Sequence, residues 1–326
     1  MIKEENGLII GDLCIDPSKS SKYKNIFFSH AHSDHVKLAK NSSSTHFATK
    51  ETIDLIKKRY EKSFGLNFSP LEINKKIKFD NFEIELFSNG HILGSTGINL
   101  DFYNKNYIIT SDFRTSDSIL FKGLKPIESE VLVLETTFAS PEFNFPNHFD
   151  VVNEMVSWIE KNAKNKLIIL SGYSLGKAQE LTKISNMAGF VPLVHESIFE
   201  MNKIYSNHGV DIGKYELLNH NLKDHNVLIM PQNLIDKFLF STIKEFDKRD
   251  ILCAIATGWN AQGFDKCFPL SNHCDYNELI EFVKESNPKL VLTDHGYSQE
   301  FARTLNKLGY NSRPLKQSSQ KQLFEF

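Results

Sequence analysis

The fold of this 326-residue chain is decided by the stretch Ile26-Phe27-Phe28-Ser29-His30-Ala31-His32-Ser33-Asp34-His35-Val36, in which an apolar run leads into four metal-binding side chains. His30 and His32 are two residues apart, so on an extended segment both point to the same side. Asp34 and His35 follow at the expected start of a helix and are aimed at a neighbouring point. Imidazole and carboxylate ligands suit zinc, although iron or manganese could use the same groups. The stretch therefore predicts a site for two metal ions.

Two residues further along the chain are candidates to complete this site. His91 lies in the segment SNGHILGS (88–95), where flanking glycines allow backbone and metal to approach closely. Asp112 follows an expected strand and is able to bridge two metals about 3.5–4 Å apart. An aspartate in that position is otherwise a common turn or cap residue, and a chance cluster of histidines on a loop is the plain alternative for the first stretch.

The motifs HAHSDH, GHILGS and TSDF, in this order, resemble those of the metallo-β-lactamase superfamily. The resemblance implies that the first zinc ion is held by His30, His32 and His91. It places Asp34 and His35 on the second zinc and Asp112 between the two ions. Asp16, in the sequence CIDP (14–17), matches a structural aspartate that steadies the metal-binding loop from behind the ligands.

Three more features resemble the additional motifs of the β-CASP nucleases, which are an acid, a histidine and a second histidine. Glu135 ends the apolar run VLVLE, His273 precedes an expected helix in LSNHCD, and His295 follows the run LVLTD. The segment GYSLGKAQE (172–180) is also similar to a strand-to-helix stretch of those nucleases. The segment ETTFASPEFNFP (135–146) looks closest to compact archaeal 3′-end-processing-factor-like proteins and bacterial ligase-associated exonuclease-like proteins.

The resemblance assigns a role to each of these three residues. Glu135 would orient His273 and support its charged form, and His273 would be a general acid that protonates the leaving oxygen. His295 would complete the second zinc site. The plain alternatives are a strand-end acid and polar residues that cap helices. Asp34, or Asp112, is the candidate to accept a proton from the attacking water.

The predicted fold class is α/β, a metallo-β-lactamase αββα sandwich with a small inserted β-CASP-like α/β domain. The expected division is an N-terminal part of the sandwich (1–146), the inserted domain (147–260) and a C-terminal part of the sandwich (261–326). Hydrophobic patterns in the first part predict strands at 7–15, 25–29, 82–88, 96–102, 107–110 and 131–135, and helices near 33–39 and 50–60.

After Pro146 the patterns alternate between helix and strand, which is typical of a mostly parallel sheet. Helices are expected at 149–162, 175–187, 198–206, 234–246, 275–285 and 298–308. Strands are expected at 166–171, 191–194, 227–230, 251–257 and 290–293.

Composition narrows the class of protein. The formal net charge of -2 is not that of a protein that coats nucleic acid, but a nuclease can keep its basic groups in one cleft. The sequence has no apolar run of about 18 residues, so no membrane span is expected. The start MIKEENGLII lacks the apolar core of a signal peptide, and the four cysteines form no CxxC pair. A reduced, cytoplasmic location is therefore expected.

The predicted function is that of a zinc-dependent nuclease that hydrolyses phosphodiester bonds, with two Zn²⁺ ions and with Mn²⁺ or Fe²⁺ as alternatives. RNA is favoured over DNA, because a histidine at the last motif is typical of RNA-type β-CASP members, and both endo- and 5′-exoribonuclease activity in RNA processing fit. The alternatives are a DNA exonuclease in repair, a thioester or lactone hydrolase of the same fold, and a non-catalytic partner subunit. A homodimer is expected by analogy with relatives.

Contacts to the nucleic-acid backbone have two candidates. Lys177 lies at an expected helix start and Arg114 lies just past Asp112. For each of them, an ordinary surface cation is the favoured alternative.

Overall fold

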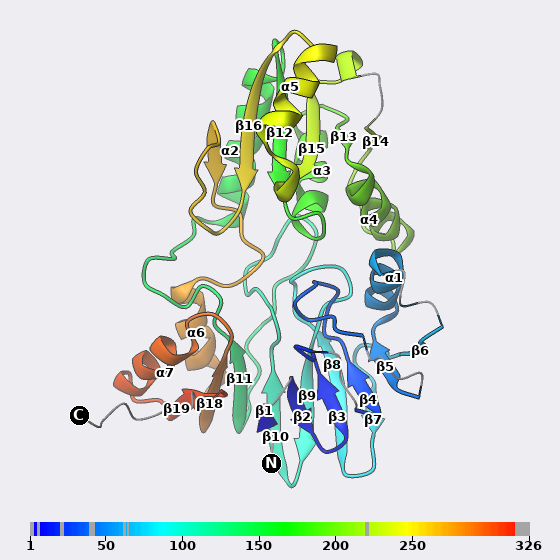
Figure 1. The fold of residues 1–326 in the computed structure, drawn as a ribbon. Helices are drawn as coiled ribbons and strands as arrows, with labels where there is room; N and C mark the ends of the chain where they lie inside the picture. The colour runs from blue at the N-terminus through cyan, green and yellow to red at the C-terminus, as the bar shows by residue number, and fades with distance from the viewer. Residues whose placement is uncertain are drawn as a thin grey trace, which may run out of the picture.

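Two bodies make up the molecule, each built around β-sheets (Figure 1). The structure is a computed structural model, and it describes residues 3–4, 7–19, 23–38, 43–60, 63, 65–218 and 222–316. The lower body in Figure 1 contains two sheets with helices outside them, and the upper body contains a third sheet with its own helices.

The first sheet has the order β1-β2-β3-β4-β5-β6 and the second has the order β19-β18-β11-β10-β9-β8-β7. The strands of the first sheet are β1 (Lys3–Glu4), β2 (Leu8–Ile10), β3 (Leu13–Ile15), β4 (Asn25–Phe27), β5 (Thr45–Ala48) and β6 (Asn67–Pro70). Those of the second are β7 (Lys76–Lys78), β8 (Phe82–Ser88), β9 (Thr96–Phe102), β10 (Lys105–Ile109), β11 (Val131–Glu135), β18 (Leu290–Asp294) and β19 (Ser312–Pro314). Strands β10, β11, β18 and β19 run parallel to one another.

The two sheets of the lower body pack face to face. Strand β8 alternates buried residues with less buried ones, so Ile84 and Leu86 point into the core while glutamates point away. Across the interface they share one apolar cluster with Leu13 and Phe27 of the first sheet. Helix α1 (Lys50–Arg59) packs on the outer face of the first sheet, and α6 (Tyr276–Ser286) and α7 (Ser298–Lys307) pack on the outer face of the second. These four layers are consistent with the expected metallo-β-lactamase-like α/β fold.

The third sheet is wholly parallel, with the order β14-β13-β15-β12-β16-β17. Its strands are β12 (Lys166–Gly172), β13 (Leu193–Val194), β14 (Glu216–Leu217), β15 (Val227–Pro231), β16 (Asp250–Ala256) and β17 (Lys266–Phe268). Helices α2 (His148–Asn162) and α3 (Lys177–Met187) share a core with one face of this sheet. Helix α5 (Lys237–Phe246) packs against the other face. The parallel sheet expected after Pro146 is therefore present.

Helix α4 (Glu196–Asn207) joins the two bodies, because its residues belong to both cores. Ile198 packs in the core of the third sheet, whereas Met201 and Tyr205 pack against the outer layer of the first sheet. Two short 3₁₀ helices, η2 (Leu222–Asp224) and η3 (Gln232–Leu234), flank β15.

Several local expectations were wrong. The single strand expected at 7–15 is two antiparallel strands, because Gly11 adopts a φ of +57° and reverses the chain. The helix expected near 33–39 is not formed over 33–38, and residue 39 lies outside the described residues. There the carbonyl of His32 accepts hydrogen bonds from the amides of His35 and Val36, which makes one turn that does not propagate. Seven short strands were missed, namely β1, β5, β6, β7, β14, β17 and β19.

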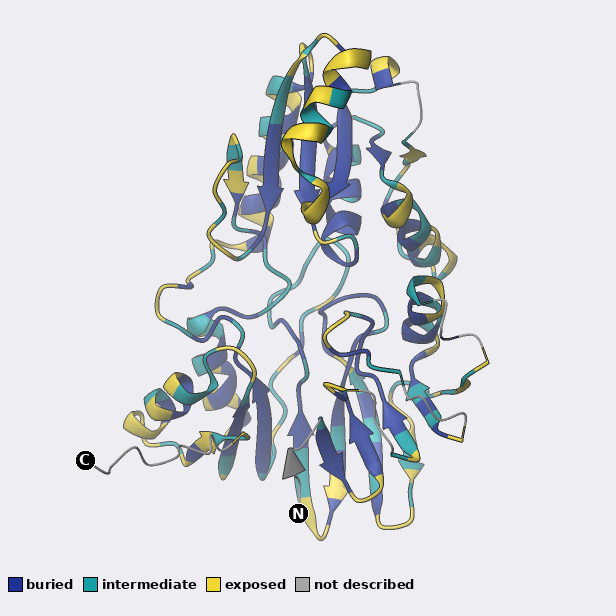
Figure 2. Ribbon diagram, viewed as in Figure 1, coloured by how far each residue is buried: buried dark blue, intermediate teal, exposed yellow. Residues whose placement is uncertain are grey.

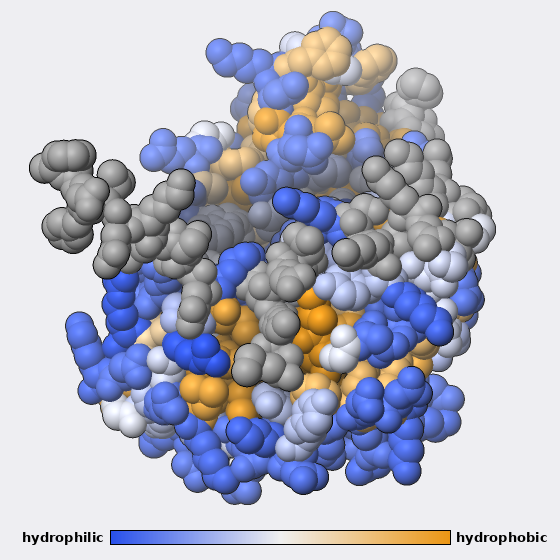
Figure 3. Space-filling view, turned by 60° about the horizontal axis from the view of Figure 1, so that its bottom comes forward, coloured by the Kyte–Doolittle hydropathy of each residue, from blue (hydrophilic) through white to orange (hydrophobic). Residues whose placement is uncertain are grey.

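Burial follows the three sheets. Their central strands are buried along most of their length, while the helices expose their outer faces (Figure 2). Hydrophilic side chains cover much of the face of the lower body shown in Figure 3, with apolar groups gathered in its middle. Among the described residues, no helix has both the length and the apolar character that crossing a membrane requires.

Candidate metal centre

The candidate site residues gather at one edge of the lower body, facing the third sheet. Strands β10, β11 and β18 are parallel neighbours, so their carboxyl ends meet at this edge. The segments that reach it are the loop after β4 (His30 to His35), the loop after β8 (His91), the end of β10 (Asp112), the end of β11 (Glu135), the segment before α6 (His273) and the end of β18 (His295).

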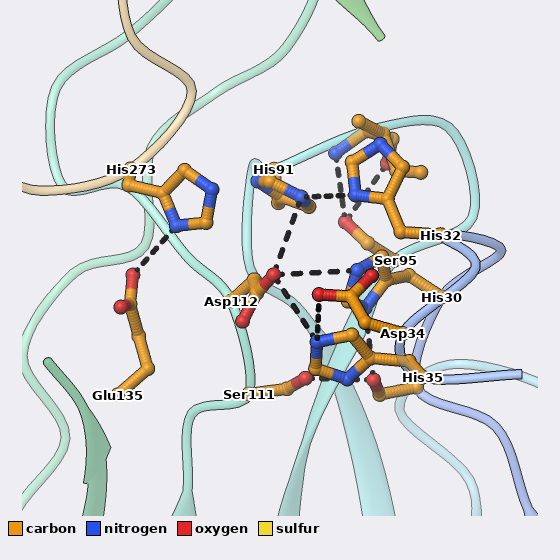
Figure 4. Close-up of polar contacts among 12 residues, drawn as sticks. His30, His32, Asp34, His35, His91, Ser95, Ser111, Asp112, Glu135 and His273 are labelled. Atoms are coloured by element: carbon orange, nitrogen blue, oxygen red, sulfur yellow. Dashed lines mark hydrogen bonds and ion pairs between the residues drawn. The ribbon is translucent and has the colours of Figure 1, made fainter. Parts of the chain in front are cut away.

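Four of the predicted ligands form a tight group. One ligand atom from each of His30, His32, His91 and Asp112 lies within 4.8 Å of all the others (Figure 4). Nε2 of His91 is 3.1 Å from Nδ1 of His32. Oδ2 of Asp112 is 3.4 Å from Nε2 of His30 and 3.7 Å from Nε2 of His91. Three imidazoles and a carboxylate are thus turned to one point, as a bound cation requires.

The far nitrogen of each imidazole is held by another group. Nδ1 of His91 contacts the carbonyl of Asn272 at 3.0 Å, and Nε2 of His32 contacts the carbonyl of Leu175 at 3.2 Å. A carbonyl can only accept, so these nitrogens carry the hydrogen and the opposite nitrogens keep their lone pairs for the centre. Leu175 belongs to the third-sheet body, so the two bodies hold this group together.

Burial adjusts the protonation of the group toward metal binding. It lowers the pKa of His32 to about 3 and that of His91 well below its usual value. For Asp112, burial by itself raises the pKa, but the charge of His35 and other contacts hold it well below the usual value. Neutral imidazoles and an ionised carboxylate are the forms that ligate a cation. The buried Nε2 of His30 has no hydrogen-bond partner among the described residues, and a metal ion would satisfy it.

The other predicted ligands form a looser group, in which Asp34 and His295 are exposed and His35 is buried. Nε2 of His35 is 3.4 Å from Oδ2 of Asp112 and 3.8 Å from Oδ2 of Asp34. The ring of His295 stacks on that of His35 with centroids 5.3 Å apart, and its Nδ1 is 3.2 Å from Oδ2 of Asp294. Among the described residues, the tight groups of ligand atoms include neither Asp34 nor His295. The structure therefore brings these residues side by side, but their ligand atoms do not converge as closely as those of the first group.

Asp16 lies behind both groups, as expected for a residue that steadies the loop. Its Oδ1 accepts the amide of Ser29 at 2.8 Å, and its Oδ2 is 3.0 Å from Nδ1 of His35. The Ser29 hydroxyl donates to the same carboxylate and lies 3.0 Å from Nδ1 of His30. Ser111 donates to the Ser29 hydroxyl at 2.6 Å. Ser29 and Ser111 were not among the predicted site residues, and their only signal in the sequence is adjacency to His30 and Asp112.

Glu135 and His273 form a pair beside the metal group. Oε1 of Glu135 is 3.0 Å from Nδ1 of His273, and Oε2 accepts the amide of Thr137 at 2.8 Å. Burial alone lowers the pKa of His273, but the Glu135 charge and hydrogen bond raise it above its usual value. Its ring lies edge-on to that of His91, with centroids 4.6 Å apart. Figure 4 shows the second ring nitrogen of His273 turned toward the histidine group. His273 is therefore placed to donate a proton toward the histidine group.

The start of helix α6 fixes the position of His273. Asp275 caps the helix by accepting the amide of Glu278, while the Glu278 carboxylate accepts the amide of Asp275. Asp275 also accepts the amide of Phe145 at 2.8 Å. The cap therefore joins the strand-end segment of Glu135 to the segment of His273.

Lys177 and Arg114 are not surface cations. Both are buried, and both face the buried carboxylate of Glu180. Nζ of Lys177 is 3.1 Å from Oε2 of Glu180, and Nη1 of Arg114 is 3.7 Å from Oε1. His148 joins them, with Nε2 3.5 Å from the same oxygen, and burial lowers its pKa to about 4. The alternative of an ordinary surface residue was wrong for both cations, because the sequence does not show that Arg114 and His148 meet Lys177 around Glu180 in the interior.

Known proteins similar to this chain were found by sequence. No protein-family model matches it. A probable DNA ligase of Opitutus terrae is 28% identical over 92% of this chain, and the DNA cross-link repair 1A protein of Gallus gallus is 24% identical over 86%. The chain covers 29% and 31% of the lengths of these relatives. The probable RNase MJ4 of Methanocaldococcus jannaschii is 24% identical over 70% of the chain and 65% of its own length.

A solved structure is similar in fold. A crystal structure of a protein of unknown function from Enterococcus faecalis V583 covers 90% of this chain and 79% of that protein, with a TM-score of 0.61 and 16% identity. Together with the motifs and their geometry, the sequence relatives confirm the resemblance of this chain to the metallo-β-lactamase/β-CASP nucleases.

Proposed function

We propose that this protein is a nuclease that hydrolyses phosphodiester bonds with two metal ions, most suitably Zn²⁺, with Mn²⁺ or Fe²⁺ as alternatives. The observation that carries the proposal is the 3.0 Å contact between Glu135 and His273, next to the group of three histidines and Asp112. Departure of an alkoxide from phosphorus benefits from an acid at this place, whereas opening a lactam or lactone has less need of one.

Each candidate site residue has a role in this proposed reaction. Two bound metal ions would lower the pKa of water and offset negative charge on the phosphate. His30, His32 and His91 would hold one ion, Asp34, His35 and His295 the other, and Asp112 would lie between them. His273 would give its proton to the leaving oxygen while Glu135 keeps the imidazole charged. Asp34 or Asp112 would take up a proton from the attacking water.

The domain division is part of the same proposal. The third sheet would be the small inserted β-CASP-like domain, predicted at residues 147–260 between the sandwich parts 1–146 and 261–326. Strand β17 pairs with β16, which supports extending the insert to Phe268. The insert would form one wall of the cleft, because Leu175 and Lys177 line it together with His32 and His273.

Two polymers are candidate substrates. A histidine at position 295 supports RNA, as does the relative described as a probable RNase, for endo- or 5′-exoribonuclease activity. The relatives that share most of this chain are described as a DNA ligase and a DNA cross-link repair protein, which supports a DNA exonuclease in repair. We take DNA as the first candidate and RNA as the second. A homodimer and a cytoplasmic location stay predictions.

One experiment separates these possibilities. Single-stranded RNA and DNA of one sequence, labelled at the 5′ end, are incubated side by side with the zinc-loaded protein and with its His273→Ala variant. Metal-dependent cleavage of one polymer that falls sharply in the variant is expected. Absence of cleavage of both by the wild type would refute the nuclease. Equal hydrolysis of a thioester or lactone by wild type and variant would then favour the small-molecule hydrolase.

A further inference from the structure

Two aromatic side chains stand exposed in the cleft that holds the candidate metal centre. Trp259 is 42% exposed and Tyr173 is 55% exposed, although most aromatic residues near them are buried. Both line the same cleft as His32, His91 and His273. Clefts that bind ligands are typically lined by aromatic side chains with a few polar groups among them.

Their placement follows from the topology of the third sheet. Strands β12 and β16 are parallel neighbours, with Ser171 opposite Ile255, and Tyr173 and Trp259 follow shortly after the carboxyl ends of these strands. Those ends point to the lower body and its metal-binding loops (Figure 1). The carboxyl edge of an open parallel sheet is where such sheets bind their ligands.

The indole of Trp259 is held in place from behind. Its ring centroid lies 4.6 Å from that of Phe138 and 5.4 Å from that of Phe143. The ring centroid of Phe138 in turn lies 5.7 Å from that of His273, so the Phe138 ring lies between the exposed indole and the proposed acid. Gly258 lets this packing form, because a Cβ there would lie 2.7 Å from the Phe138 ring. A fixed indole loses little conformational freedom when it binds a flat ligand.

Such a surface matches one part of a polynucleotide. Nucleobases stack on aromatic side chains without regard to sequence, and this is how many proteins hold single strands. The bases of a duplex already stack on their neighbours, so they reach a protein ring only after costly unstacking. His32, His91 and His273 line the same cleft, so the phosphate adjoining a stacked base would lie at the candidate metal centre.

We propose that Trp259, together with Tyr173, forms a subsite that stacks an unpaired nucleobase next to the bond to be cut. This inference rests on the proposed nuclease function and adds its substrate class, which is single-stranded nucleic acid or the frayed end of a duplex. The sugar does not enter into stacking, so the subsite serves RNA and DNA alike.

Kinetics with four variants test the subsite. The substrate is a single strand of about 12 nucleotides, within the site sizes that single-strand-binding clefts use. Trp259→Ala is expected to raise KM roughly 5- to 150-fold, the range that loss of one base–aromatic stack produces. Tyr173→Ala should raise KM less, because no aromatic ring among the described residues packs against Tyr173. Trp259→Phe keeps a ring and should stay near the wild type. The matched control is Phe238→Ala, which removes a 76% exposed ring on α5 that does not line the cleft.

A modified substrate separates stacking from structural damage. The same strand with abasic positions beside the cut should bring wild type and Trp259→Ala to one KM. An unchanged KM for Trp259→Ala on the normal strand would overturn the subsite, and so would an equal loss on the abasic strand. Failure of the wild type to cleave either RNA or DNA would instead refute the nuclease function itself.

Fluorescence gives a second readout. The chain has two tryptophans, so Trp158→Phe leaves Trp259 as the only one. The change is combined with His273→Ala, which suppresses turnover. The normal strand should quench the fluorescence of Trp259 to saturation. The abasic strand at the same concentration should leave this fluorescence unchanged. Equal responses to both strands would contradict stacking on Trp259.

Discussion

Nδ1 of His91 lies 3.0 Å from the carbonyl oxygen of Asn272, although 181 positions separate the two residues in the chain. The side-chain amide of Asn272 donates to Oε2 of Glu180 at 3.0 Å. Asn272 also directly precedes His273. One residue therefore connects a candidate metal ligand, the proposed acid and helix α3 of the third-sheet body.

Glu180 is the centre of this connection, and its charge is expected to matter for stability. Glu180→Gln would leave Lys177 and Arg114 buried without an anion, and breaking a buried ion pair costs about 3–5 kcal/mol. The free energy of unfolding should fall by that amount in urea titrations. The control is Glu281→Gln, which breaks the exposed pair with Lys284 and should change stability by less than about 0.5 kcal/mol. Equal effects of the two changes would contradict a central role.

His148 is expected to make stability depend on pH in the acid range. Burial lowers its pKa in the folded protein from 6.5 to about 4, so the unfolded chain binds a proton more readily between these values. Stability that is present above pH 6.5 is therefore lost as the pH falls toward 4. His148→Gln should flatten the pH dependence of the unfolding midpoint in this window. The same slope in wild type and variant would show that His148 does not contribute.

Asp16 is expected to govern metal affinity without touching the metal. Asp16→Asn keeps an acceptor for the Ser29 amide but loses the negative charge beside Nδ1 of His35. Replacing such a supporting partner typically weakens metal binding about 10- to 100-fold. Competition with a chelating dye would measure the loss. Asp12→Asn, at a more exposed site that accepts from Asn25, is the control and should bind metal as the wild type does.

Gly176 is expected to set the fit between the two bodies. A Cβ on Gly176 would lie 2.6 Å from Cγ2 of Ile92, which is adjacent to His91, and φ at Gly176 is +87°. Gly176→Ala should cost about 1–3 kcal/mol of stability and reduce kcat. Gly189→Ala is a matched control, since φ there is +82° and nothing lies within 4 Å of the added carbon. Gly189→Ala should lose only the stability that the positive φ costs an alanine, and it should leave kcat unchanged.

The sequence could predict which residues gather at the candidate centre, because metal ligands are confined to a few side-chain types, often at strand ends. His30, His91 and Asp112 all follow apolar runs that form strands. The helix expected after His32 could not be excluded from pattern, since the loop is held by Asp16, which pairs with it only in the folded chain. The pair of Lys177 with Glu180 is local to α3, but its burial was hidden, because Arg114 and Asn272 reach the Glu180 carboxylate only in the folded chain.

The contact between His91 and Asn272 joins an early part of the chain to a late one. Residues 1–146 contain His30, His32, His91 and Asp112, but neither Asn272 nor His273. Under the proposed function, a truncated product of these residues would carry four candidate ligands and lack the acid that protonates the leaving oxygen. We expect such a product to be inactive on nucleic acid.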